Sequence, residues 1–229
     1  ASSYEMTHDR EYLAVRNACA LFDVSALYKY EISGSDAGDF LQRMVTRDLS
    51  KMGVGGMAYT PWCDSTGKVV DDGTIVRLSQ ETYRLTAADP NYHWMLENAP
   101  GFDINIRDVS EELGTLALQG PCSRDVLAEC FAERAEEVRA LKFYGTCWVP
   151  FQGQSLMISR TGYTGDLGYE IWVPTELATA CWDRLMEVGR RYAIQPAGIW
   201  ALDVARIEAG LIMLDVDYYP SQKATRSEE

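Results

Sequence analysis

Two adjacent carboxylates, Asp71 and Asp72, lie within a run of apolar and β-branched residues that is typical of a strand. Because side chains alternate between the two faces of a strand, Asp72 shares a face with Val70, Thr74, Val76 and Leu78. This face is the more apolar one, so Asp72 is expected to point inward, where a carboxylate without a fixed partner is costly. Gly73 removes a side chain beside it, which suits close approach of a flat ligand. Two interpretations stay open: a ligand-binding carboxylate, or a structural one satisfied by local hydrogen bonds.

A second set of residues forms a glycine-rich loop between two expected strands. Gly162, Gly165 and Gly168 shape this loop, and Glu170 and Trp172 then share one face of the strand that follows. A carboxylate acceptor next to an aromatic ring suits a heterocycle that has N–H donors along one edge. The alternative is a glycine-rich hairpin in which Glu170 is merely exposed.

A third set lies on a helix expected over residues 198–210. Asp203 and Arg206 are three residues apart, so they are neighbours on the helix surface and can form an ion pair. The other option is that Arg206 faces a ligand, but the spacing favours the structural pair.

The elements that must position these residues alternate irregularly between strands and helices. Hairpin-type turns are expected at residues 64–67 and 152–153. Many antiparallel hairpins with helices between them indicate an α+β fold and not a doubly wound parallel sheet. Strands are expected at 27–32, 57–62, 68–78, 83–86, 104–109, 116–118, 148–151, 156–159 and 169–173, and helices at 37–45, 90–96, 121–131, 176–192 and 198–210.

Composition and charge exclude several classes of protein. The formal net charge is -13, which disfavours nucleic acid as a partner. No apolar run is long enough to cross a membrane, and the first residues do not resemble a signal peptide. No phosphate-binding glycine motif follows a strand. The two histidines, His8 and His93, are far apart, so neither a metal site nor a histidine-based nucleophilic centre is expected. Six scattered cysteines predict buried or half-buried free thiols in a reducing compartment.

Taken together and in order, five short motifs resemble the aminomethyltransferase family, which comprises the T-protein of glycine cleavage and its tetrahydrofolate-dependent demethylase relatives. The resemblance extends from about Ala18 to Leu214. Each motif is weak alone, but their order along the chain is specific. The motifs are Phe22-Asp23-Val24-Ser25, Asp71-Asp72, Leu116-Ala117-Leu118-Gln119-Gly120-Pro121, the Arg160–Gly165 stretch with Gly168-Tyr169-Glu170-Ile171, and Arg206-Ile207-Glu208-Ala209-Gly210-Leu211.

The resemblance implies a fold of two interleaved antiparallel-sheet and helix units around a folate pocket, followed in the family by a C-terminal β-barrel that is absent from this chain. Residues 1–215 are expected to form the folate-binding domain. Residues 216–229 are polar and are expected to be a linker or a truncated end.

The resemblance also assigns roles to individual residues. Asp72 matches the family's essential carboxylate, which lies close to the reactive nitrogens of tetrahydrofolate; it is therefore expected to be catalytic and to contact the cofactor. Glu170 matches the acceptor at the pterin edge, and Tyr163 matches a pocket tyrosine. Trp172, beside Glu170, completes the expected cofactor-binding set. No metal is expected.

Departures from the family pattern bear on the substrate. Leu202 stands where glycine-cleavage members usually have arginine, and Ala26-Leu27 replaces the usual His-Met. These changes favour a divergent member, such as a demethylase of a small methylated amine, sulfonium or methoxyaromatic compound, over the standard aminomethyltransferase.

Further alternatives stay open. One is a non-enzymatic folate-binding assembly factor, although the cysteine-containing signature of those relatives is missing here. Another is a module of a flavin-dependent oxidase that passes formaldehyde equivalents to folate. The expected partners are a small methyl or aminomethyl donor and, as a further option, a lipoyl carrier protein. The expected compartment is the cytoplasm, or the mitochondrial matrix in a eukaryote.

Overall fold

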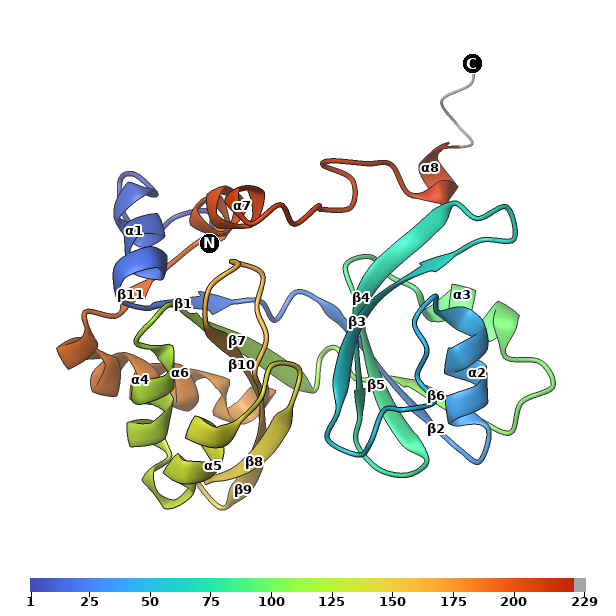
Figure 1. Ribbon diagram of the computed structural model, residues 1–229, viewed down its shortest axis with the longest axis horizontal. Coiled ribbons are helices and arrows are strands. Elements are labelled where there is room, and N and C mark those ends of the chain that lie inside the picture. The colour runs from blue at the N-terminus through green and yellow to red at the C-terminus, as the bar shows by residue number, and fades with distance from the viewer. Residues whose placement is uncertain (225–229) are drawn as a thin grey trace. The chain divides into compact units, whose positions relative to one another are not determined.

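The computed structural model describes residues 1–224, which form two compact units (Figure 1). Unit 1 contains residues 1–26 and 112–211, and unit 2 contains residues 27–111 and 212–224. The polypeptide therefore leaves unit 1 after its first strand, builds most of unit 2, completes unit 1, and then returns to unit 2. The α+β fold with two interleaved units, predicted from the sequence, is confirmed.

Unit 1 contains a six-stranded sheet in the order β11-β1-β7-β10-β9-β8. Neighbouring strands are antiparallel except β1 and β11, which are parallel. At the hairpin between β8 and β9, Gln152 and Gly153 both have positive φ, 48° and 81°, as a tight two-residue turn requires. The strands are β1 (Ala20–Asp23), β7 (Leu113–Gln119), β8 (Thr146–Phe151), β9 (Gln154–Ser159), β10 (Gly168–Pro174) and β11 (Gln195–Pro196).

Helices cover both faces of the unit 1 sheet. On one face, α4, α5 and α6 pack against alternating apolar residues such as Leu118 and Ile171. On the second face, α1 and α7 enclose a smaller cluster that includes Phe22 and Ala117. The buried Glu11 of α1 accepts hydrogen bonds from residues 3–5 and from Gly198 N, which joins the N-terminal segment to the start of α7. The helices are α1 (Asp9–Asn17), α4 (Ser123–Cys130), α5 (Ala135–Ala140), α6 (Ala178–Gly189) and α7 (Ile199–Glu208), with short 3-10 helices at Ala132–Arg134, Thr175–Leu177 and Arg190–Tyr192.

Unit 2 contains a five-stranded antiparallel sheet in the order β3-β4-β5-β2-β6. Helices α2 (Ala37–Met44) and α3 (Tyr92–Asn98) cover one face of this sheet. The spacing of Ala37, Phe40 and Leu41 places all three side chains on the buried side of α2. The strands are β2 (Tyr28–Ser33), β3 (Met57–Cys63), β4 (Val69–Arg77), β5 (Thr82–Ala87) and β6 (Asn105–Asp108).

The described part of the segment expected to be a polar linker or a truncated end is in contact with the unit 2 sheet. Within residues 216–224, Pro220 and Ser221 are buried, and α8 (Ser221–Ala224) packs against β4. Apolar burial of Pro220 and hydrogen bonding of Ser221 to the Asp64 carboxylate explain why this polar stretch is held on the sheet. The remaining residues of that prediction, 225–229, lie outside the described part of the chain.

Candidate functional site

Asp72 lies in the middle of β4 and is half-buried. Both of its carboxylate oxygens accept a hydrogen bond from a tyrosine. Tyr59 Oη, from the neighbouring strand β3, lies 2.7 Å from Asp72 Oδ2. Tyr218 Oη, from the segment that precedes α8, lies 3.2 Å from Asp72 Oδ1. Two phenol donors fix the orientation of the carboxylate and leave further lone pairs on each oxygen for a ligand.

The prediction that Asp72 points into the core is wrong, because Asp71 takes that place. Asp71 is fully buried, on the face of β4 that also carries the core residue Ile75. The cause is an irregularity opposite Trp62: this residue pairs with Asp71, whereas Cys63 pairs with Val69. A bulge of one residue shifts the alternation, so Val70 cannot be used to assign the face of Asp72.

Asp71 is held by a buried hydrogen-bond network. Its carboxylate accepts bonds from Asn91 Nδ2 at 2.6 Å, from Asp89 N at 3.0 Å and from Asp72 N at 2.7 Å. Burial raises the pKa of Asp71 to about 6, although these hydrogen bonds act in the opposite direction. Asn91 Oδ1 in turn accepts from Trp62 Nε1 at 3.2 Å. The network ties the loop before α3 to the part of β4 that carries Asp72.

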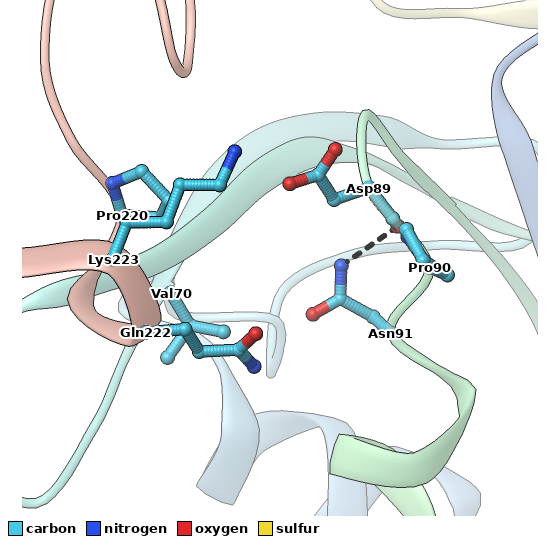
Figure 2. Close-up of a pocket in the computed structure, with 7 residues that line it drawn as sticks. All are labelled: Val70, Asp89, Pro90, Asn91, Pro220, Gln222 and Lys223. Carbon is cyan, nitrogen blue, oxygen red and sulfur yellow. Dashed lines mark hydrogen bonds between the residues drawn. The ribbon is translucent and has the colours of Figure 1, made fainter. Parts of the chain in front are cut away.

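A small pocket lies beside this network (Figure 2). Asn91 and Asp89, on one side of it, are already bonded to each other through Asn91 Nδ2 and the Asp89 carbonyl oxygen at 2.9 Å. Lys223, on the opposite side, forms an ion pair with Asp215. None of the predicted site residues lines the pocket, so we do not assign it to the candidate site. The lining residues are Val70, Asp89, Pro90, Asn91, Pro220, Gln222 and Lys223.

Glycine is required at position 73 by the close packing of two strands of the sheet, and not by the approach of a flat ligand. A Cβ atom at this position would lie 1.8 Å from the carbonyl oxygen of Thr86 in β5. Beside it, Thr86 Oγ1 accepts from Thr74 N at 3.0 Å and thereby stands in for a backbone partner. Any larger residue at 73 would push the two strands apart.

Glu170 lies on β10 and is half-buried. Within residues 1–224 no backbone or side-chain group donates a hydrogen bond to it. It pairs in register with Ala117, so it lies on the face of the unit 1 sheet that α1 and α7 cover in part. Burial raises the pKa of Glu170 to about 7. A half-buried carboxylate without a protein donor is a candidate acceptor for a ligand.

Trp172 lies on the same face two residues further along β10. Only 3% of its surface is exposed, and its Nε1 donates to Ser159 Oγ at 3.1 Å. The structure therefore gives Trp172 a packing role in the sheet. Its predicted role in stacking on a ligand ring stays a prediction.

The glycine-rich loop between β9 and β10 is wrapped around the side chain of Gln119. A Cβ atom at Gly162 or Gly168 would lie 1.9 or 2.1 Å from Gln119 Oε1. Gln119 Nε2 donates to the carbonyl oxygen of Thr161 at 3.2 Å, and Thr164 Oγ1 donates to Gln119 Oε1 at 2.9 Å. The two glycines are needed because the buried amide occupies the space that their side chains would fill.

Arg16 of α1 binds the loop between β9 and β10 through hydrogen bonds. Its Nη1 donates to the carbonyl oxygen of Thr164 at 2.7 Å and to the Asp166 carboxylate. Its Nη2 lies 2.7 Å from Glu208 Oε2 on α7. Between these anchors, Tyr163 packs against the apolar cluster of α1 and α7. The loop thus holds Tyr163 on the same sheet face as Glu170.

The pair predicted on the last long helix is present. Arg206 Nε lies 2.7 Å from Asp203 Oδ1, and Arg206 Nη1 donates to the Leu211 carbonyl oxygen at 3.2 Å. Arg206 is 2% exposed, so its guanidinium is a structural tie at the end of α7. Leu202 is buried in the cluster that α7 shares with α1. The surroundings of this side chain are therefore apolar, which suits a leucine and would not suit the charged guanidinium of an arginine.

The predicted residues divide between the two units. Unit 1 brings Tyr163, Glu170 and Trp172 to one face of its sheet, and unit 2 carries Asp72. Sequence reasoning missed the two phenol donors to Asp72, Tyr59 and Tyr218. The period of the strand gives a signal for Tyr59, which pairs diagonally with Asp72, but no local pattern indicates Tyr218.

The cysteines are free thiols, as predicted. Cys19 and Cys181 are buried and the other four are half-buried. Burial raises the pKa of the Cys19 and Cys181 thiols to about 12. Within residues 1–224, histidine, cysteine and carboxylate side chains form no group of three that could hold a metal ion. In the same part of the chain, no helix has both the length and the apolar character needed to cross a membrane.

Comparison with known sequences gives a consistent result. The family model of the GCVT N-terminal domain matches residues 1–227. The aminomethyltransferase of Caldanaerobacter subterraneus subsp. tengcongensis is 39% identical over 205 residues, which cover 88% of this chain and 54% of that protein. The trimethylamine-oxide aldolase of Ruegeria pomeroyi is 37% identical over 216 residues, which cover 91% of this chain and 27% of that protein. The chain thus spans about half the length of the aminomethyltransferase and a smaller share of the aldolase.

Solved structures show the same relationship. The glycine cleavage system aminomethyltransferase T of Bartonella henselae superposes with a TM-score of 0.84 and 27% identity, over 96% of this chain and 58% of that one. A chain of the heterotetrameric sarcosine oxidase of Corynebacterium sp. U-96 has a TM-score of 0.54 and 14% identity, over 77% of this chain and 86% of that one. The second likeness concerns the fold alone. The family resemblance predicted from the five motifs is confirmed.

Proposed function

Because this chain belongs to the GCVT N-terminal domain family, we propose that it is the tetrahydrofolate-binding part of a one-carbon transferase of the aminomethyltransferase type. The named activities of its relatives support an enzyme over a non-enzymatic folate-binding assembly factor. The transferred group in this proposal is an aminomethyl or methyl unit.

The observation that carries this proposal is the carboxylate of Glu170. It is half-buried, its pKa is raised to about 7 by burial, and no group in residues 1–224 donates to it. A pterin ring presents N–H donors along one edge, and a carboxylate is a suitable acceptor for two of them. We assign Glu170 to the pterin edge, with Tyr163 and Trp172 as further cofactor-binding residues.

Asp72 is the proposed catalytic residue and a cofactor contact. Bound tetrahydrofolate supplies the nitrogen nucleophile that accepts the one-carbon unit. The Asp72 carboxylate, oriented by Tyr59 and Tyr218, orients that nitrogen, accepts its proton and stabilises positive charge that develops there. This role requires a carboxylate in a fixed orientation, and the hydrogen bonds from the two phenols hold both of its oxygens in place.

A second candidate is a folate-dependent demethylase of a small methylated compound. Two observations favour it: Leu202 sits in an apolar cluster where the family resemblance implies an arginine, and one relative is named a trimethylamine-oxide aldolase. Both candidates share the cofactor and the Asp72 chemistry, and they differ in the donor. The proposed partners are therefore a small methyl or aminomethyl donor and, for the first candidate, a lipoyl carrier protein.

The free thiols and the charge bear on the setting. Six unpaired cysteines suit a reducing compartment, so we place the protein in the cytoplasm, or in the mitochondrial matrix of a eukaryote. A net charge of -13 opposes nucleic acid as a partner.

Titration of the full-length protein with tetrahydrofolate, followed by tryptophan fluorescence, tests the cofactor assignment. We expect saturable binding, and we expect Glu170→Gln to weaken it about 10- to 100-fold, the value of a hydrogen bond to a charged group. The matched control is Glu133→Gln, which removes the same charge from an exposed position. Absence of saturable binding in the wild-type protein would refute the proposal.

The role of Asp72 is tested by turnover. A screen of glycine-cleavage intermediates, sarcosine-type amines, sulfonium compounds and methoxyaromatics would follow the formation of methyl- or methylene-tetrahydrofolate. With the donor so identified, Asp72→Asn is expected to retain tetrahydrofolate binding and to lower kcat about 100-fold or more. Unchanged kcat in this variant would show that the catalytic carboxylate lies elsewhere.

A further inference from the structure

The last described segment of the chain returns to unit 2 and supplies one of the two donors to Asp72. Tyr218 Oη lies 3.2 Å from Asp72 Oδ1, although 146 positions separate the two residues along the chain. The other donor, Tyr59, comes from the strand next to Asp72 and is held by the sheet itself. Tyr218 needs a support of its own.

A compact turn holds Tyr218 from its N-terminal side. Met213 N donates to Asp217 Oδ2 at 2.7 Å, and Asp217 N donates back to the Met213 carbonyl oxygen at 2.9 Å. Asp215 has a positive φ of 64°, and its N–H donates to the Tyr218 carbonyl oxygen at 2.9 Å. The backbone of Tyr218 is therefore part of a closed hydrogen-bonded turn.

Helix α8 holds the segment from the C-terminal side of Tyr218. Pro220 is buried and lines the pocket together with Val70 of β4 (Figure 2). The Ser221 hydroxyl bonds the Asp64 carboxylate, and Lys223 forms an ion pair with Asp215 of the turn. Tyr218 thus lies between two anchors, which restrict the positions its phenol can take.

We propose that Tyr218 is a positioning residue that, by holding one oxygen of the Asp72 carboxylate, sets the orientation in which Asp72 acts. This inference rests on the proposed function, since it takes Asp72 as the catalytic carboxylate. Tyr59 alone binds only Oδ2 and leaves the carboxylate free to rotate about that contact. With Tyr218 on Oδ1, both oxygens are fixed, and the lone pairs that face a ligand point in one direction.

The adjacent residue supplies a matched control. Tyr219 is 74% exposed, so Tyr219→Phe makes the same chemical change one position away without affecting Asp72. In the full-length protein, Tyr218→Phe keeps the ring and removes the donor. We expect kcat to fall about tenfold, with KM for tetrahydrofolate changed less than about twofold, because the residue acts on the orientation of Asp72 and not on cofactor affinity.

A second measurement does not depend on turnover. Urea-unfolding midpoints would be compared for the wild type, Tyr218→Phe, Asp72→Ala and the double variant. Asp72→Ala removes the acceptor, so Tyr218→Phe should lower the midpoint clearly in the wild-type background and much less in the Asp72→Ala background. A purely local structural role of Tyr218 would lower the midpoint equally in both.

The outcomes separate this inference from the proposed function. Wild-type kcat in Tyr218→Phe, or equal midpoint losses in the two backgrounds, would overturn the inference and leave the proposed function standing. Full turnover in Asp72→Asn would overturn the proposed role of Asp72, and this inference with it. A fall in kcat in both Tyr218→Phe and Tyr219→Phe would also overturn the inference, since Tyr219 does not touch Asp72.

Discussion

Replacing Glu170 by glutamine should make the protein more stable while weakening its binding of tetrahydrofolate. Folding moves this carboxylate into a half-buried place without a donor in residues 1–224, and its pKa rises from 4.5 to about 7. Folding therefore disfavours the ionised form. The cost is absent below pH 4.5, grows as the pH rises from 4.5 to 7, and is complete above pH 7.

The size of the effect follows from the same values. The pKa of Glu170 rises by about 2.5, from 4.5 to about 7, and at 1.36 kcal/mol for each pKa unit this corresponds to ~3 kcal/mol. Because Glu170 is only half-buried, solvent screening lowers this to ~1–2 kcal/mol. Glutamine has nearly the same shape and no charge, so it should recover that free energy above pH 7 and none of it at pH 4.

Urea unfolding at pH 4, 6 and 8, followed by fluorescence, measures the gain. Glu133→Gln is the control, because its exposed side chain removes one negative charge without relieving any burial. An equal gain for Glu170→Gln at all three pH values would refute the argument, since a pH-independent effect cannot come from a buried charge. A loss of stability at pH 8 would show instead that Glu170 has a stabilising partner in the free protein.

Two further substitutions test the supports of the site. Gly162→Ala should lower the free energy of unfolding by ~1–3 kcal/mol and weaken tetrahydrofolate binding, because its Cβ would lie 1.9 Å from Gln119 Oε1. Gly53→Ala, with no atom within 4 Å of the added Cβ, is the control in the same unfolding assay, and equal midpoints would contradict the packing of the loop. Glu11→Gln should lower the free energy of unfolding by ~1–3 kcal/mol at pH 7. The reason is that one of the groups that donate to the Glu11 carboxylate would then face an amide N–H in place of an oxygen. Burial alone would raise the pKa of Glu11, but its hydrogen bonds lower the pKa overall. The stability lost in Glu11→Gln should therefore shrink as the pH falls below 4.5. Glu5→Gln serves as the exposed control, and a loss of stability that does not depend on pH would contradict the role of the ionised Glu11 carboxylate.

The sequence predicted correctly those features that depend on residues close to one another along the chain. The turn at Asp64 was predictable because Asp64 Oδ1 accepts from Thr66 N and Lys68 N within the turn. The period of apolar residues likewise predicted α2, and the three-residue spacing of Asp203 and Arg206 predicted their ion pair on α7. In each case residues within a few positions of one another determine the conformation.

The errors have a common cause, which is that they depend on residues distant in the sequence. The face of Asp72 depends on a one-residue irregularity opposite Trp62, and strand alternation cannot reveal an irregularity in advance. The clash that requires Gly73 comes from Thr86 on another strand. Strand β11 has two residues, too few to show any period, and α1, α5 and β1 were not predicted either.

The interleaved course of the chain also has a consequence for how the protein emerges during synthesis. Strand β1 is made early, yet its partners β7 and β11 begin only at residues 113 and 195. Unit 2 can pair all five strands of its sheet once residue 108 has been synthesised. At that point both edges of β1 still lack their partner strands. Sheet closure in unit 1 should therefore be slow, and until then the nascent chain should depend on chaperones that shield Leu21 and Phe22.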